Sequence, residues 1–372
     1  MTQSIPVIDL FAGAGGLGIA AKLAGADLRL SVDNDRYSCE TLRLNALGHG
    51  DAVMEADVTE LNGPQLLDAA KLTPRENHIV VGGAPCQPFS KAAYWVDRGE
   101  EAAYRRARAR GEAATRPTDP LLVRPDQRRT LVAEYWRLVV ETSASGFVFE
   151  NVPSILHPRN RAVFESLEEA AERAGYMTTR VVATATDFGV AQARQRVFLL
   201  GSKHSKPVAP APTHSKDQTG YLPQWVTAGE ALAELGDTDP EDGEELVGRW
   251  AEHLREIPPG MNYKFHSTWA GHPKPTFEAE TRYWNFLLKL SPERPSWTIP
   301  ASPGPWTGPF HWDNRRLRVP ELARLQTFPV GYTFAGPRRE QIRQIGNAVP
   351  VLMGQHMVHA VSDALDSTTQ AA

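Results

Sequence analysis

The sequence predicts an α/β fold, in which a doubly wound, mostly parallel sheet is joined to a smaller second domain. Three observations predict it: short apolar runs spaced like buried strands, helical patterns between them, and a glycine-rich turn directly after the first run. Strands of a parallel sheet are buried on both faces, so they have continuous apolar runs. In such sheets, ligands bind at the carboxyl ends of the strands.

The apolar runs that we interpret as strands are Pro6–Leu10, Leu28–Val32, Ile79–Val81, Phe147–Phe149 and Val197–Leu200. Helical spacing of apolar residues is found in Thr130–Thr142 and Ala162–Ala174, and Gly175 is suited to end the second helix. A turn and an apolar helix are expected over Gly346–Leu365. The strand–helix alternation stops near Gly201. We therefore predict a larger domain formed by residues 1–201 and 343–372, and a smaller domain with its hinge formed by residues 202–342.

The composition excludes some classes of protein. With 372 residues and a net charge of −4, the chain is not a general polyanion binder. Its arginines are nevertheless clustered: residues 98–129 contain nine Arg and five acidic residues, and residues 313–343 contain seven Arg and three acidic ones. Such clusters are typical of a solvated surface or of phosphate contacts. Transmembrane runs and a secretory signal are absent, and two cysteines do not make a disulfide framework, so we expect a cytoplasmic protein.

The first predicted strand continues into a glycine-rich turn at residues 9–18. Gly13, Gly15 and Gly18 match the G-x-G-x-x-G pattern of dinucleotide-binding proteins. Asp33, at the end of the second strand, is placed to bind a ribose hydroxyl. Asp57, after the next strand region, either accepts a hydrogen bond from an adenine amino group or caps the following helix. A nicotinamide-dependent dehydrogenase and a purely structural turn both remain open at this point.

A second turn, residues 82–90, follows the predicted strand Ile79–Val81 and is rich in Gly and Pro. It contains a cysteine. This residue, Cys86, is suited to act as a nucleophile, because a thiolate on a constrained loop at the ligand edge is reactive. Cys39 lies instead in a predicted helix, Tyr37–Leu44, where packing is its expected role.

Six short blocks, taken in order, resemble the DNA (cytosine-5) methyltransferase family of bacterial type. They are Asp-Leu-Phe-Ala-Gly-Ala-Gly-Gly at 9–16, Pro-Cys-Gln at 85–87, Glu-Asn-Val at 150–152, Gln-Ala-Arg-Gln-Arg at 192–196, the segment 315–329 and the segment 344–350. The resemblance covers about residues 1–201 and 295–360. It implies a Rossmann-like methyltransferase fold, S-adenosylmethionine as the methyl donor, and a target-recognition domain.

The resemblance implies covalent catalysis on cytosine. Cys86 attacks carbon 6 of the ring, and Glu150 supplies a proton or hydrogen bond to ring nitrogen 3, for which its carboxyl must be protonated. Arg194 and Arg196 alternate on an extended segment, so both are expected to face the same side. One of them holds the carbonyl oxygen of the base, and the pair positions Glu150 and the backbone. Without the resemblance, Glu150 would be interpreted as a helix-terminal or surface acid, and the arginines as phosphate or sheet-edge contacts.

By the same resemblance, a set of residues at the strand ends contacts the methyl donor. Asp33 is expected to bind its ribose and Asp57 its adenine. The family often has Glu at the position of Asp33, and Asp is one methylene shorter. The full expected set is Phe11, Ala12, Gly13, Gly15, Gly16, Leu17, Asp33, Asn34, Asp57, Val58, Pro85 and Asn347.

The target base lies inside a duplex and has to be flipped out of the stack. The loop from Gln87 to about Asp119 is placed to close over it, and the arginines of residues 98–116 either contact phosphates or line a solvated helix. Residues 202–310 correspond to the recognition region. The five tryptophans of residues 269–312 are expected to form a core rather than to stack on bases: Trp269, Trp284, Trp297, Trp306 and Trp312. The four histidines of residues 253–311 lack cysteine partners and metal-ligand spacing, so we expect no structural zinc: His253, His266, His272 and His311.

The sequence thus predicts a monomeric enzyme that methylates cytosine in a specific duplex DNA sequence, in a restriction–modification setting with a cognate endonuclease as a functional partner. An RNA cytosine-5 methyltransferase is the main alternative. The long segment between the block at 192–196 and the block at 315–329 favours DNA, because it supplies a groove-reading domain. A nicotinamide oxidoreductase would leave Cys86, Glu150 and the two arginines without a shared purpose. A binding protein with an inactive site is disfavoured because all the chemical groups are present.

Overall fold

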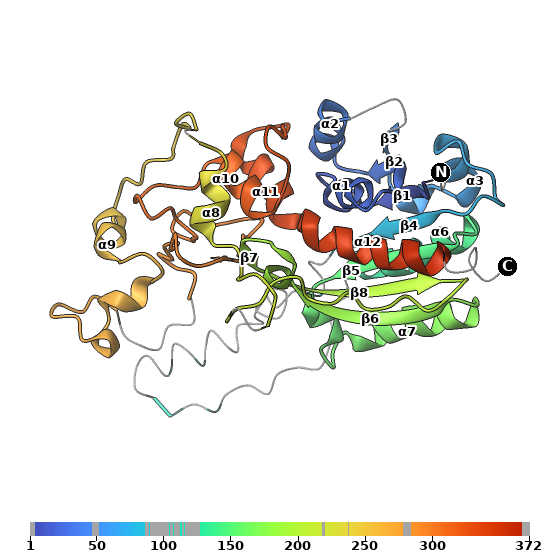
Figure 1. Cartoon of the computed structure of the whole chain (residues 1–372). Helices are drawn as coiled ribbons and strands as arrows, with labels where there is room; N and C mark the ends of the chain where they lie inside the picture. Colours follow the sequence, from blue (N-terminus) through green and yellow to red (C-terminus); the bar gives the residue numbers. More distant parts are fainter. Residues whose placement is uncertain are drawn as a thin grey trace.

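The computed structural model describes residues 4–46, 52–85, 127–217, 220–236, 238–277 and 284–366, and a few isolated positions between 89 and 115. Its centre is a seven-stranded sheet in the order β3-β2-β1-β4-β5-β8-β6 (Figure 1). These strands are β1 (Pro6–Leu10), β2 (Asp27–Asp33), β3 (Ala52–Glu55), β4 (Ile79–Gly82), β5 (Gly146–Asn151), β6 (Met177–Thr184) and β8 (Gln195–Ser202). Strands β1 to β5 run parallel, whereas β8 is antiparallel to both β5 and β6.

Helices cover both faces of this sheet and bury separate apolar clusters. On one face, α1 (Gly16–Leu23) packs against α12 (Val351–Asp366), which also contacts β5 and β8. The other face is covered by α3 (Gly63–Ala69), α6 (Leu131–Glu141) and α7 (Arg161–Arg173). The mostly parallel, doubly wound α/β fold is therefore confirmed.

The predicted elements of the larger domain are present. All five predicted strands form, and the two predicted helices correspond to α6 and α7, the latter ending before Gly175, which has a φ of +87°. Strand β6 was not predicted, because it lies at the sheet edge and several of its residues are exposed. Near the end of the chain, α11 (Arg338–Asn347) extends further than expected, so the turn before α12 is confined to residues 348–350.

The rest of the chain forms short elements. Strand β7 (Gln192–Ala193) pairs with β9 (Ser296–Trp297). Helices α8 (Ala228–Ala233), α10 (Val319–Leu325) and α11 share one apolar cluster, while α9 (Ala251–Glu256) belongs to another. In Figure 1, α9 lies at the end of the molecule away from the seven-stranded sheet. Within the described residues, none of the helices has the length and apolar character needed to cross a membrane.

One buried hydrogen bond links α6 to the middle of the sheet. Tyr135 is fully buried, and its hydroxyl donates to the carbonyl oxygen of Val80 in β4, 3.0 Å away. We expect Tyr135→Phe to lower the free energy of unfolding by about 1–2 kcal/mol, because a buried acceptor loses a donor. Urea unfolding followed by circular dichroism measures the difference. Tyr221→Phe, at a fully exposed tyrosine, is the matched control, and equal stability of the two variants would contradict the expectation.

Candidate active site at the carboxyl edge of the sheet

A turn with left-handed backbone connects β1 to α1. Phe11, Gly13 and Gly15 have φ values of +55°, +55° and +85°. The next residue, Gly16, packs against the segment before α12, since a Cβ there would come within 2.5 Å of the carbonyl oxygen of Val349. A Cβ on Gly13 would meet nothing within 4 Å. The turn is therefore closely packed at Gly16 but open at Gly13, where a ligand can approach the backbone.

Asp33, at the end of β2, fastens this turn to the neighbouring strand. Its Oδ2 accepts a hydrogen bond from the amide of Gly13, and its Oδ1 accepts one from the amide of Asp35, both at 2.8 Å. Burial raises the pKa of the Asp33 carboxyl, and the two amide hydrogen bonds oppose that rise. Each carboxylate oxygen can accept one more hydrogen bond, which suits it to bind a hydroxyl group.

Asp57 lies beside Asp33, because β2 and β3 pair in parallel with Asp33 opposite Glu55. Its Oδ1 accepts hydrogen bonds from the amide and the hydroxyl of Thr59, at 2.9 and 2.8 Å. These bonds cap the short helix Val58–Glu60 and lower the pKa of Asp57. The helix-cap interpretation of Asp57 is therefore confirmed, and the cap occupies one carboxylate oxygen.

Glu150, near the end of β5, and Arg196, near the start of β8, bring a carboxyl and a guanidinium together. Glu150 and Arg196 are 7% and 8% exposed, and Arg196 Nε lies 2.7 Å from Glu150 Oε1. Burial raises the pKa of the Glu150 carboxyl, and the positive charges of Arg196 and Arg194 oppose that rise. The other oxygen, Oε2, lies against Gly83, where a Cβ would be only 2.7 Å away.

The neighbour of this acid holds the loop that leads to Cys86. Asn151 is fully buried, and its Nδ2 donates to the carbonyl oxygen of Ala84 at 3.1 Å. Its Oδ1 accepts from the amide of Val152 at 2.9 Å, which fixes the amide group in place. From the sequence, Asn151 was expected only as part of a family block. An amide residue at the end of a buried apolar strand is the signal that indicates a positioning role.

The proposed nucleophile, Cys86, lies outside the described residues, as do Gln87, most of the loop to Asp119 and the arginines of residues 98–116. The described residues on either side are Pro85, which is partly buried, and Phe89, which is fully buried in the core below β4 and β5. The guanidinium of Arg129 stacks over the Phe89 ring at 4.9 Å.

Arg194 has different partners from Arg196. It is 1% exposed, and its guanidinium donates to the carbonyl oxygens of Gly346 at 2.8 Å and Ile299 at 3.4 Å. We expected the pair to position Glu150 and the backbone, and these two contacts are divided between the two arginines. Arg196 binds the carboxyl of Glu150, whereas Arg194 joins the sheet edge to α11 and to the segment after β9.

A family model described as C-5 cytosine-specific DNA methylase matches residues 5–106 and 123–363. The chain belongs to this family. The resemblance seen in the sequence is thereby confirmed, and the protein is a DNA (cytosine-5) methyltransferase.

Sequence and structural relatives agree with this assignment. Type II methyltransferase M.SacI of Streptomyces achromogenes is 36% identical, covering 98% of this chain and 94% of its own. Type II methyltransferase M1.HphI of Haemophilus parahaemolyticus is 30% identical, covering 96% and 87%. A solved DNA modification methyltransferase encoded within an E. coli prophage has a TM-score of 0.66 at 21% identity, covering 98% of this chain and all of its own, which shows the shared fold.

The methyltransferase fold and family imply S-adenosylmethionine as the donor, and the residues at this edge fit it. The opening at Gly13 and the hydrogen-bonding capacity of Asp33 suit a ribose beside the glycine turn. Among the residues expected to contact the donor, Leu17 and Val58 are 4% exposed and their side chains pack in apolar clusters, so the expected contacts fall to their backbones. Ala12 is also buried, whereas the exposed residues of the expected set are Asn34 and Asn347.

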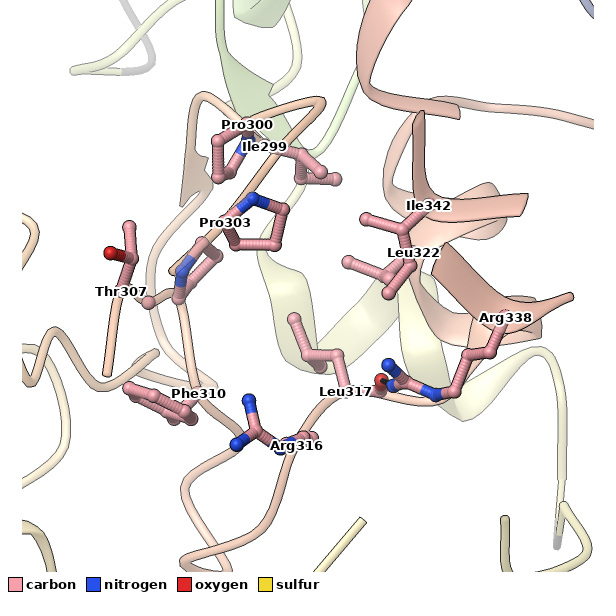
Figure 2. A pocket seen from close by; sticks show the side chains of 12 residues that line it. Ile299, Pro300, Pro303, Thr307, Phe310, Arg316, Leu317, Leu322, Arg338 and Ile342 are labelled. Atoms are coloured by element: carbon pink, nitrogen blue, oxygen red, sulfur yellow. Dashed lines mark hydrogen bonds between the residues drawn. The ribbon is translucent and has the colours of Figure 1, made fainter. Parts of the chain in front are cut away.

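A cavity of about 40 Å³ lies outside this edge (Figure 2). It is bounded by the segment Ile299–Phe310, by α10 and by α11, and Arg316 and Arg338 stand at its side. None of the expected catalytic or donor-binding residues lines it, and its volume suits one or two water molecules rather than a base.

The recognition region departs from two expectations. Trp297, Trp306 and Trp312 pack against apolar clusters, as predicted, but Trp269 is 76% exposed and Trp284 47% exposed. The second departure concerns the histidines: His266 and His272 lie together with Glu256, each offering one atom within 4.8 Å of the others. The expectation of no metal site was based on spacing in the sequence, and that spacing did not reveal this spatial grouping.

The environment of Cys39 allows a chemical test of the two cysteines. Cys39 is fully buried in α2 (Arg36–Leu44), its thiol donates to the carbonyl oxygen of Asp33, and burial raises its pKa to about 12. We expect iodoacetamide to modify the native protein once, at Cys86, because alkylation needs an accessible thiolate. Intact mass and peptide mapping measure this, with urea-unfolded protein as the doubly modified control. Comparable labelling of Cys39 in the native protein would contradict it.

Proposed function

We propose that this methyltransferase modifies a specific duplex DNA sequence through a covalent bond between Cys86 and carbon 6 of a flipped-out cytosine. The main support is the Glu150 carboxyl, which is buried, bound by Arg196 and packed against Gly83, three residues before Cys86. A buried acid beside the loop of a nucleophile is the arrangement that proton donation to the substrate requires.

In this proposal, the Cys86 thiolate forms a bond to carbon 6 and breaks the carbon 5–carbon 6 double bond. The displaced electron pair builds negative charge toward ring nitrogen 3. Glu150 donates a proton to ring nitrogen 3, and burial favours its protonated form. Arg196 keeps the carboxyl in position and donates to the carbonyl oxygen of the base. After carbon 5 has gained the methyl group, a water molecule or another base takes its proton, the double bond re-forms and the thiolate departs. Nitrogen 3 returns its proton to Glu150, which restores the acid.

Bound S-adenosylmethionine supplies an electrophilic methyl group, because its sulfur is positively charged. The protein has to orient that methyl group toward carbon 5. Asp33 binds the ribose, and Asp57 accepts from the adenine amino group with the oxygen that the helix cap leaves available. Phe11, Pro85 and Asn347 complete the pocket.

The target base has to leave the duplex before Cys86 can reach it. The described part of residues 202–342 supplies a separate group of short elements that suits sequence recognition, and relatives named Type II methyltransferases support a restriction–modification setting. A cognate endonuclease and a monomeric state belong to this proposal. Transfer of a labelled methyl group to duplex DNA but not to RNA is the expected result, and preferential labelling of RNA would replace the proposed substrate.

Cys86→Ser is expected to abolish methyl transfer, because a serine hydroxyl at neutral pH is a far weaker nucleophile than a thiolate. Donor affinity should change little, since the glycine turn and Asp33 are unaltered. Filter-bound radioactivity measures turnover, and duplex DNA with 5-fluorocytosine should trap the wild-type protein as an adduct. Cys39→Ala is the matched control, and it should retain turnover. Normal activity of Cys86→Ser would refute the covalent route.

Glu150→Gln is expected to reduce kcat about 100- to 10,000-fold, because an amide cannot donate the proton that the attacked ring needs. Single-turnover methylation of a duplex measures the loss, and thermal unfolding checks that the variant is folded. The matched control is Glu169→Gln, at an exposed acid of α7. A loss confined to DNA affinity, with kcat unchanged, would show that Glu150 serves binding and not proton transfer.

A further inference from the structure

We propose that Glu256, His266 and His272 form a binding site for a divalent transition metal ion such as Zn²⁺, which fastens three segments of the recognition region together. Glu256 ends α9, His266 ends the short helix Tyr263–His266, and His272 follows the next turn. Each of the three offers one ligand atom, and these atoms lie within 4.8 Å of one another. The inference does not depend on the proposed catalytic mechanism.

The hydrogen bonds of the two rings leave one nitrogen of each with a lone pair. His266 Nε2 lies 2.8 Å from the carbonyl oxygen of His253, so Nε2 carries the proton and Nδ1 the lone pair. His272 Nδ1 lies 2.8 Å from the carbonyl oxygen of Lys274 and 3.2 Å from the amide nitrogen of the same residue. The shorter contact is the one to the acceptor, so it favours a proton on Nδ1 and a lone pair on Nε2. Ring N–H groups bound to backbone carbonyls are the usual support of metal-binding histidines.

Two acceptors face each other in this cluster. Glu256 Oε2 lies 3.6 Å from His266 Nδ1, which is too long for a hydrogen bond, and neither atom has a proton in the assigned tautomer. Such a pair is repulsive unless a cation lies between them. In a tetrahedral zinc site, neighbouring ligand atoms are about 3.3 Å apart. The 3.6 Å separation is therefore already close to the one that a metal ion requires.

The three ligand atoms are within 4.8 Å of one another, so metal binding requires them to move closer, and an exposed ligand can supply this movement. The Glu256 side chain is 62% exposed and can rotate, whereas His266 is 1% exposed and holds its position. Two imidazole nitrogens and one carboxylate oxygen suit Zn²⁺ with a water as the fourth ligand, and disfavour Mg²⁺ and Ca²⁺, which prefer oxygen ligands alone.

Edge-to-face contact between the rings is the competing explanation of the histidine cluster. The ring centroid of His266 lies 5.0 Å from that of His253 and 4.8 Å from that of His272, with the ring planes 69° and 64° apart. These contacts account for the proximity of the rings, but they do not account for a carboxylate oxygen 3.6 Å from a ring nitrogen. A protonated His266 would also attract Glu256, and the experiment below separates that case from a metal site.

The apolar core around the cluster is small, and a bound metal ion would stabilise it. Helix α9 has six residues, and the apolar cluster beneath it contains a small set of buried residues: Leu246, Leu254, Ile257, Tyr263, Leu287 and Phe310. Small cores gain stability from structural metals. The exposed Trp269 lies between the ligands His266 and His272 in sequence, so a bound ion would also fix the loop that presents this side chain.

The test uses the full-length protein, freed of metal with a chelator and titrated with Zn²⁺. We expect one bound ion per chain by elemental analysis and a higher Tm on binding. Glu256→Gln and His272→Gln, at side chains that are not buried, should each weaken binding about tenfold or more. The matched controls are Glu252→Gln, on the same helix, and His359→Gln, at an exposed histidine of α12, and both should bind as the wild type does.

Co²⁺ serves as a second probe, because it distinguishes nitrogen and oxygen ligands from a cysteine thiolate by its absorption spectrum. Visible bands without sulfur charge-transfer absorption are expected, and they should persist in Cys86→Ser. Binding that survives in both ligand variants, or that is lost in Cys86→Ser, would overturn the proposal. A failure to bind Zn²⁺ stoichiometrically would also overturn the proposal, and ring contacts or protonation of His266 would then explain the cluster. Methyl transfer would be unaffected in that case.

Discussion

The active site depends on a buried ion pair between the end of one strand and the start of another. Burying Glu150 and Arg196 is costly, and an apolar pair at such positions is often as stable or more stable. The pair lies at one edge of the sheet because β8 runs antiparallel to β5, with Glu150 opposite Phe198 and Asn151 opposite Val197. If β8 were parallel, its first residues would lie at the opposite edge. The reversed strand is therefore what brings the guanidinium to the carboxyl.

The same edge of the sheet also binds segments from late in the chain. Arg194, two residues before Arg196, binds the carbonyl oxygens of Ile299 and Gly346. The glycine turn is held in a similar way, since Gly16 packs against Val349 and the hydroxyl of Tyr332 donates to the carbonyl oxygen of Ala14. The shape of this N-terminal turn therefore depends on residues near the other end of the chain.

The sequence predicted the elements whose burial produces a local pattern. Strands such as β4 are buried along their whole length and have continuous apolar runs, whereas the edge strand β6 has exposed residues and no such run. An apolar run also contains no information on direction, so the reversal of β8 could not be predicted from it. Among the site residues, the chemical types were readable, but the partners of Arg194 were not, because they are backbone carbonyls more than 100 positions away.

The histidine cluster shows a further limit of motif-based prediction. Spacing rules identify metal ligands that lie on one helix or one turn, where the chain itself sets the distance between side chains. Glu256 and His266 end two different short helices, and His272 lies in the segment after a third, so their separation in sequence says nothing about their separation in space. What brings them together is the packing of α9 and the Tyr263–His266 helix around Leu254 and Tyr263. A site assembled in this way can be found only once the tertiary structure and the hydrogen bonds of the rings are known.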